Sequence, residues 1–120
     1  MSTSELATVL AWHDALSASD VDTLVTLSSD DIEVGDAHGA GQGHQALRRW
    51  AEDDAGITAG LGRIYVHDGV VVVELLPAGA GAVQAAAFRV VDDHVTSVFR
   101  HEDLDSALSA TDLTEADRID

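Results

Sequence analysis

The residues of this chain best suited to proton transfer stand at the end of a short predicted strand. Ile32 to Val34 leads into the Gly-rich stretch GDAHGAGQG, which places Asp36 and His38 two residues apart. A carboxylate or imidazole that loses solvation beside an apolar pocket becomes a useful proton acceptor near neutral pH. The alternative is structural: Asp36 accepts backbone N–H groups in an Asx turn, and His38 is solvated. The sequence is compatible with both interpretations.

A further histidine, His101, ends the last predicted strand. That strand alternates between two sets of side chains, with Val95, Ser97, Phe99 and His101 on one side and Thr96, Val98 and Arg100 on the other. Only one set faces the interior of the fold. We expect the set with Phe99 and His101 to face inward, which would bring His101 to the site as a second catalytic group. In the opposite phase, Arg100 takes that place.

The aromatic residues are few. They are Trp12, Trp50, Tyr65, Phe88 and Phe99. In so small a set, each is more often a core residue than a ligand contact. Where a pocket exists, the two tryptophans are expected to line it from the first and third helices, and the small residues at 85–87 leave space beside the sheet. The predicted pocket lining is Trp12, His38, Trp50, Tyr65, Ala86 and Phe99.

The sequence favours neither a metal ion nor a cofactor. Asp36, His38 and His44 are suitable ligand types, and His67 or His101 would complete a set, but their spacing matches no metal-binding motif. There are no cysteines. The glycines at 39, 41 and 43 resemble a phosphate-binding loop, but the chain contains no lysine. We therefore predict no metal, no cofactor and no nucleotide.

Composition restricts the partners further. The 120 residues make one domain, with 22 Asp and Glu against six Arg and a formal net charge of −16. Such a charge repels phosphate backbones and anionic lipids, so neither nucleic acid nor a membrane is expected as a partner. No leader is visible and the longest apolar run, Val70 to Val73, is too short to span a bilayer. We expect a cytoplasmic protein, whose acidity suggests a salt-adapted or GC-rich source.

Periodicity predicts the elements that must position these residues. A helix capped by Ser4 runs to about Ser17, a second starts at Asp20, and a third covers His44 to Asp54. Strands are predicted over 32–34, 63–67, 70–76, 82–91 and 94–101, with turns at 67–69, 77–81 and 92–93 and a Gly-rich loop at 35–43. A short helix follows at 104–110, and residues 111–120 are expected to fray.

This order predicts an α+β domain with an antiparallel meander of four strands. The run from Val70 to Val73 shows no polar alternation, so that strand is covered on both faces. The sheet must therefore curl around the helices. No repeat or linker divides the chain, and residues 1–120 form a single domain.

Several short segments of the sequence resemble those of the NTF2-like superfamily, which includes SnoaL-like polyketide cyclases, ketosteroid isomerases and limonene epoxide hydrolases. The segments are WHDAL from Trp12, SDVDTL from Ser19, DIEV from Asp31, GQGHQAL from Gly41, and the strand from Val95 to Arg100. The resemblance covers roughly residues 5 to 102. It implies a cone: a curved, mainly antiparallel sheet wrapped around three N-terminal helices, with an apolar pocket inside and a homodimer through the sheet.

Among these proteins the local likeness is greatest to the ketosteroid isomerases. Asp36 falls where their catalytic base would sit, Trp12 where their tyrosine would sit, and Ala86 near their second acid. Both oxyanion donors of the family are thus replaced, and the indole N–H of Trp12 is one substitute. An epoxide-opening relay would need Arg89 with Asp36 and a second in-strand Asp, which is not evident.

The sequence thus leaves two main hypotheses. In the first, the chain binds a small apolar or polycyclic carbonyl compound and acts as an isomerase or cyclase, with Asp36 as general base. In the second, it is a non-catalytic, dimeric ligand-binding or scaffold domain of the same fold. Whether it is an enzyme remains undecided by the sequence.

Overall fold

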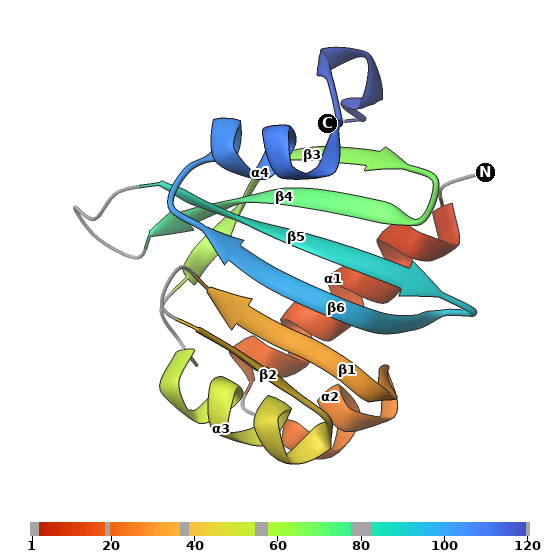
Figure 1. Cartoon of the computed structure of the whole chain (residues 1–120), viewed down its shortest axis with the longest axis vertical. Helices are drawn as coiled ribbons and strands as arrows, with labels where there is room; N and C mark the ends of the chain where they lie inside the picture. The colour runs from red at the N-terminus through yellow and green to blue at the C-terminus, as the bar shows by residue number, and fades with distance from the viewer. Residues whose placement is uncertain (1–2, 19, 37–38, 55–57, 78–82, 120) are drawn as a thin grey trace.

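The computed structural model describes residues 3–18, 20–36, 39–54, 58–77 and 83–119 (Figure 1). In chain order its elements are α1 (Thr3–Ser17), α2 (Val21–Thr26), β1 (Ser28–Asp36), β2 (Gly39–Gln42), α3 (His44–Asp54), β3 (Thr58–His67), β4 (Val70–Pro77), β5 (Gln84–Val91), β6 (His94–His101), α4 (Leu104–Thr111) and the 3-10 turn η1 (Glu115–Asp117).

One six-stranded sheet organises the chain, in the order β2-β1-β6-β5-β4-β3. The strands from β3 to β6 form the predicted antiparallel meander, and β1 then joins β6 in parallel. Helices α1, α2 and α3 lie on one face of the curved sheet, and the short α4 lies on the other (Figure 1). The α+β prediction of a sheet wrapped on three N-terminal helices is confirmed.

The apolar residues divide between the two faces of the sheet. The inner cluster, beneath α1 to α3, contains Trp12, Leu47 and Phe88 together with buried valines of five strands. The outer cluster packs α4 on the sheet through Tyr65, Val72, Ala85, Ala87, Leu104, Ala107 and Leu113. Strand β4 contributes to both clusters, since Val71 and Val73 face inward while Val72 faces α4. This explains why its sequence shows no polar alternation.

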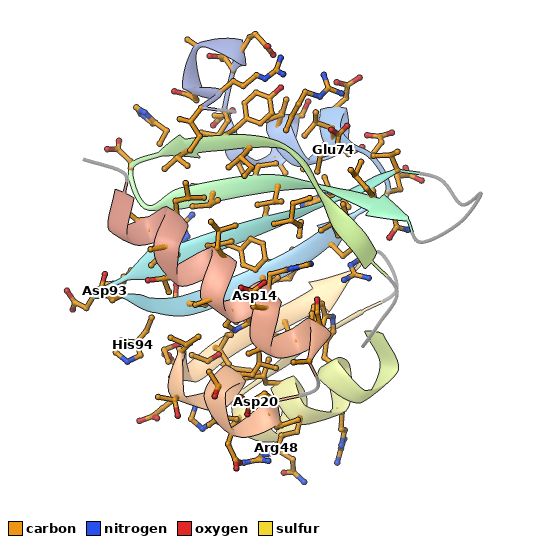
Figure 2. The ribbon with its side chains drawn as sticks, turned by 180° about the vertical axis from the view of Figure 1, so that it is seen from behind. Asp14, Asp20, Arg48, Glu74, Asp93 and His94 are labelled. Carbon is orange, nitrogen blue, oxygen red and sulfur yellow. The ribbon has the colours of Figure 1, made fainter. Side chains whose placement is uncertain are left out.

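The structure contains the helix cap at Asp20 and the two hairpin turns that the sequence predicted. Asp20, which lies at the start of α2 (Figure 2), caps that helix by accepting the backbone N–H of Thr23 at 3.3 Å. The hairpin turn before β4 has positive φ at Asp68 (47°) and Gly69 (78°). The turn before β6 uses Asp92 (51°) and Asp93 (62°). Two consecutive positive φ angles match the twist of two-residue hairpins, and Asp tolerates them better than most residues.

The predicted Gly-rich loop is wrong in part. Gly39 to Gln42 forms β2, which pairs antiparallel with the second half of β1, from Glu33 to Asp36. The strand is short and lies at the sheet edge, where glycine costs little packing. Gln42, the last residue of β2, adds a side-chain contact to β1, since its amide donates to the Asp31 backbone carbonyl at 3.2 Å.

The predicted fraying of the C-terminal residues is also wrong for residues 111–119. Leu113 is a buried member of the outer cluster, and Thr114 opens η1 with a capping box. Arg118 then forms an isolated antiparallel β-bridge with Tyr65, and the Ile119 N–H donates to the Ile64 carbonyl at 2.9 Å. The tail therefore covers the free edge of β3.

Candidate functional site

Three aromatic side chains pack together in the described part of the cone interior. The Trp12 ring centroid lies 5.7 Å from that of Trp50 and 5.4 Å from that of Phe88, the latter edge to face. Trp12 is only 1% exposed, and its Nε1 donates to Ser28 Oγ at 2.9 Å. Its indole N–H is therefore already engaged. The expectation that it substitutes for a family tyrosine as oxyanion donor does not fit this contact.

Trp50 lies at the outer side of this aromatic cluster and is only partly buried. The Arg100 guanidinium carbon lies 5.4 Å from the Trp50 ring centroid, within cation–π range. The Trp50 indole nitrogen is buried, and the described residues provide no hydrogen-bond acceptor for it. A buried donor without an acceptor is rare in folded proteins, and usually indicates a water, an ion or a ligand.

His13 of α1 belongs to the same region. Burial lowers the pKa of His13 below its ordinary value of 6.5; the carboxylate of Asp14 opposes this effect, and the positive charge of Arg100 adds to it. The imidazole is thus neutral at neutral pH and can accept a proton or a hydrogen bond. His13, Trp50 and Arg100 thus bring a neutral imidazole, an indole N–H and a guanidinium to one region, which we call the mouth of the cone.

The predicted base, Asp36, is the last residue of β1, where its backbone pairs with Gly39. Gly35 pairs with Phe99 of β6, so Asp36 stands one residue beyond that pair, beside the strand position of Arg100. The side chain of Asp36 and the whole of His38 lie outside the described part of the structure. Their predicted roles stay predictions.

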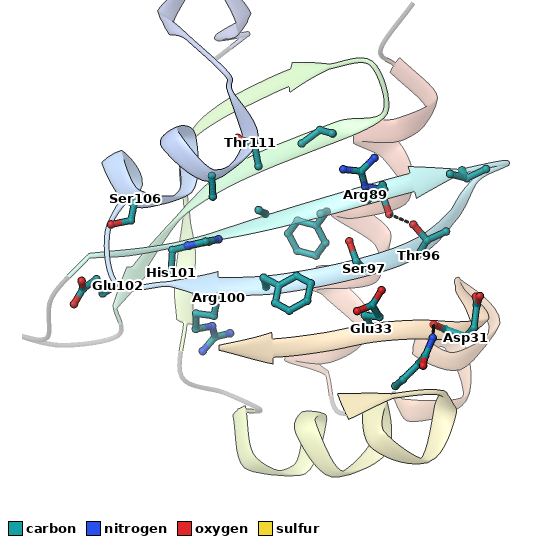
Figure 3. A pocket seen from close by; sticks show the side chains of 17 residues that line it. Asp31, Glu33, Arg89, Thr96, Ser97, Arg100, His101, Glu102, Ser106 and Thr111 are labelled. Atoms are coloured by element: carbon teal, nitrogen blue, oxygen red, sulfur yellow. Dashed lines mark hydrogen bonds between the residues drawn. The ribbon is translucent and has the colours of Figure 1, made fainter. Parts of the chain in front are cut away.

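A groove of about 910 Å3 lies on the other face of the sheet, the face that carries α4 (Figure 3). Its floor comes from β5 and β6, one wall from α4, and the opposite wall from β1 and β2. The lining residues are Asp31, Glu33, Gln42, Val70, Ala87, Phe88, Arg89, Val91, Thr96, Ser97, Phe99, Arg100, His101, Glu102, Ser106, Ala110 and Thr111.

The prediction that Phe99 and His101 face the three N-terminal helices is wrong. Arg89 pairs with Ser97 while Val90 pairs with Val95, so Thr96 is an extra residue with no partner on β5. This bulge reverses the alternation of the strand. Val95 and Val98 are both in the inner cluster, whereas Phe99 and His101 line the outer groove.

The remaining predicted pocket residues are likewise divided between the faces. Trp12, Trp50 and Ala86 belong to the interior, and Ala86 is in register with Arg100. Tyr65 packs beneath the tail on the outer face and donates its hydroxyl to Glu115 at 3.0 Å. Burial and the neighbouring Glu115 raise the pKa of Tyr65. Tyr65 and Trp12 therefore cannot share one pocket.

Sequence reasoning missed the role of α4 as the wall of the outer groove. Leu104, Ala107 and Leu108 recur at helical spacing, and this signal marks one buried face of a helix. Another side of the helix borders the groove, and its Ser106 and Thr111 belong to the groove lining. Asp103 fixes its start by accepting the Ser106 N–H at 2.8 Å.

The described residues contain neither a metal-binding cluster nor a helix suited to a membrane. Within them, no group of three or more His, Asp or Glu is placed to hold a metal ion. None of the described helices is both long enough and apolar enough to cross a membrane. The relay of Arg89 with Asp36 is not supported either, because Arg89 lines the outer groove in register with Ser97, not with the end of β1.

Comparison with solved structures identifies the fold. An NTF2-like protein of unknown function from Burkholderia xenovorans superposes with a TM-score of 0.66 at 15% identity, covering 84% of each chain. An LEH-like epoxide hydrolase from Mycobacterium tuberculosis superposes with 0.68 at 19% identity, covering 89% of this chain and 88% of the other.

A third structure, a candidate ketosteroid isomerase from Kribbella flavida, gives a TM-score of 0.67 at 16% identity, covering 82% of this chain and 77% of the other. No family model and no curated protein matches the sequence. At these identities the likeness defines the fold alone. The chain has the NTF2-like fold, as the resemblance implied.

Proposed function

We propose that this NTF2-like domain binds a small apolar molecule at the mouth of the cone, through an oxygen atom of that molecule. The observation that carries the proposal is the buried Trp50 indole N–H, for which the described residues offer no acceptor. Leaving such a donor unsatisfied costs about 1–3 kcal/mol. A carbonyl oxygen of a ligand would accept this hydrogen bond, while the ligand body packs beside the partly buried ring of Trp50.

The neighbouring groups support a carbonyl compound as the ligand. Trp50 and Arg100 are both donors, and a carbonyl that becomes an enolate gains negative charge on the oxygen they would contact. The backbone of Asp36 stands beside the Arg100 position, at the end of β1. In the finer form of the proposal, Asp36 removes a proton from the carbon next to the carbonyl, as in an isomerase or cyclase.

Binding is tested by nuclear magnetic resonance of the two indole N–H groups, with trans-2-decalone as the probe. We expect a saturable shift of the Trp50 signal and a smaller one of Trp12, whose N–H is held by Ser28. Trp50→Phe keeps an aromatic ring but removes the donor, and should weaken binding about tenfold. Binding that is unchanged in Trp50→Phe would overturn the proposal.

Proton transfer is tested separately, by following exchange of the α-hydrogens of the same ketone in D2O. We expect the protein to accelerate this exchange and Asp36→Asn to abolish the acceleration while the Trp50 shift persists. Exchange that is equal in the Asp36→Asn variant removes Asp36 as the base but leaves the binding proposal standing.

A second candidate function is a non-catalytic ligand-binding or scaffold domain. It is favoured by the packing of Trp12, Trp50 and Phe88, which occupy the described part of the interior. Trp12 and Phe88 are 1% and 3% exposed, so neither offers surface to a ligand. This candidate predicts no shift of the Trp50 signal with decalone up to the solubility limit, and a homodimer formed through the sheet.

A further inference from the structure

The outer groove contains an arginine, Arg89, that forms no ion pair with any described residue. Among the six arginines, Arg63 is paired with Glu74 at 3.0 Å and Arg118 with Glu115 at 3.2 Å, and Arg100 lies over Trp50. Arg89 is exposed in the groove, and no described carboxylate forms an ion pair with it, although the chain has 22 acidic residues. Its charge is therefore available to a bound anion.

The strand register places apolar residues next to Arg89 in the sheet. Arg89 and Ser97 form one pair across β5 and β6, and Ala87 and Phe99 form the pair two residues further along. Two residues of strand span about 7 Å. The Phe99 ring leans over Gly35, where a Cβ would come within 2.8 Å of its Cε1 atom. The Phe99 ring therefore packs against the backbone of Gly35, and the half-buried side chain also lines the groove beside Ala87.

The groove walls add polar and acidic groups to this pattern. Glu33 of β1 is in register with Ser97 of β6, whose partner on β5 is Arg89. Asp31 lies two residues before Glu33 on β1, and Glu102 lies at the opposite end of the groove (Figure 3). These carboxylates disfavour negative charge on a ligand at every place in the groove except beside an arginine. Ser106 and Thr111 of α4 line the opposite side. The groove lining accordingly combines two arginines, of which Arg100 lies over Trp50 and Arg89 is exposed, with an aromatic ring and an acidic rim.

We propose that this groove binds a small aryl monocarboxylate, with its carboxylate at Arg89 and its ring at Phe99. The Arg89 guanidinium would take the carboxylate through two parallel hydrogen bonds, a geometry that favours arginine over any other cation. The ligand ring would stack offset on Phe99 and cover Ala87. This site is on the opposite face from Trp50, so it does not depend on the interior site proposed above.

The probe is 4-phenylbutyrate, followed by backbone amide resonances of the full chain. We expect saturable shifts at Arg89, Ser97 and Phe99, with the Trp50 indole signal unmoved. Arg89→Gln should weaken binding about tenfold or more, because it removes a charge-assisted bidentate contact. Arg49→Gln, an exposed arginine of α3 away from the groove, is the matched control and should leave affinity unchanged.

The uncharged analogue 4-phenyl-1-butanol tests the carboxylate and should bind at least about tenfold more weakly. Three outcomes would overturn the proposal. One is equal affinity for the acid and the alcohol, or for Arg89→Gln and Arg49→Gln. The second is a shift confined to the Trp50 indole. The third is a dimer in sedimentation velocity that Phe99→Glu dissociates and that phenylbutyrate does not, since a second copy would then be the occupant of the groove.

Discussion

Trp12 and Ser28 are joined by a buried hydrogen bond, in which the indole Nε1 donates to the serine hydroxyl at 2.9 Å. The hydroxyl in turn donates to the Leu24 carbonyl at 2.7 Å. Ser28 therefore connects the central aromatic residue of the interior to the end of α2. It also leaves Trp50 as the tryptophan whose N–H has no acceptor among the described residues.

Ser28→Ala should lower the free energy of unfolding by about 1–3 kcal/mol, because the buried Trp12 N–H loses its acceptor. Urea denaturation followed by tryptophan fluorescence measures the change. Ser29→Ala is the matched control: the Ser29 hydroxyl oxygen is buried and makes no hydrogen bond among the described residues, so its removal should cost little. Equal destabilisation by both variants would contradict the importance of the Trp12 contact.

Gly35→Ala should destabilise the protein by about 1–3 kcal/mol through overpacking. A Cβ at this position would lie 2.8 Å from Phe99 Cε1 and 2.9 Å from both the Ala40 Cβ and the Gly39 carbonyl oxygen. The backbone contact cannot be relieved by a side-chain rotation. Gly39→Ala provides the comparison, because nothing lies within 4 Å of a Cβ there. The melting temperature of Gly35→Ala should be clearly lower than that of Gly39→Ala. Equal melting temperatures would be evidence against this packing.

His13 should make stability depend on pH between about 7.5 and 5.5. Its pKa is lower in the folded state than the ordinary 6.5, so the unfolded chain binds more protons in this range. The stability contributed by the neutral imidazole is present above pH 6.5 and is lost as pH falls through the folded pKa. His13→Gln should therefore lose less melting temperature than the native chain between these two pH values.

His94→Gln is the control for this titration, since His94 is an exposed histidine that contacts the Asp92 carbonyl at 2.8 Å. It should retain the pH dependence of the native chain. If His13→Gln keeps the full dependence while His94→Gln loses it, the acid sensitivity comes from the turn rather than from the interior.

Salt should raise stability at low ionic strength. A net charge of −16 on a 120-residue chain repels itself, and KCl between 0.02 and 0.5 M shortens the screening length to below about 10 Å. We expect the melting temperature to rise across this range, despite the weakening of ion pairs such as Arg63–Glu74. A flat or falling series would remove both the repulsion argument and the salt-adapted source that composition suggests.

Sequence patterns predicted those parts of the fold that local chemistry determines. Asp20 was recognisable as a cap, and the turns at 68–69 and 92–93 as hairpin connections, because each depends on a few adjacent residues. Strand β2 could not be recognised, since its glycines also fit a loop and its order comes from pairing with β1. The docked tail likewise depends on distant partners, Tyr65 above all.

The candidate site was less predictable than the fold. A single extra residue, Thr96, reversed the face on which Phe99 and His101 lie, and nothing in the strand sequence marks that bulge. Arg100 was considered only as the alternative, yet it is Arg100 that lies over Trp50. The unsatisfied donor of Trp50 follows from three-dimensional packing, so no spacing in the sequence could reveal it.

The parallel pairing of β1 with β6 has a consequence for how the chain folds. Glu33 pairs with Ser97, so neighbouring strands of the sheet come from segments that are far apart in the chain. Contacts of such long sequence separation slow folding, because the intervening loop must close before they form. During synthesis, the first half of the chain emerges without its main neighbour. Its apolar helix faces have to wait for β6 to leave the ribosome before the cone can assemble.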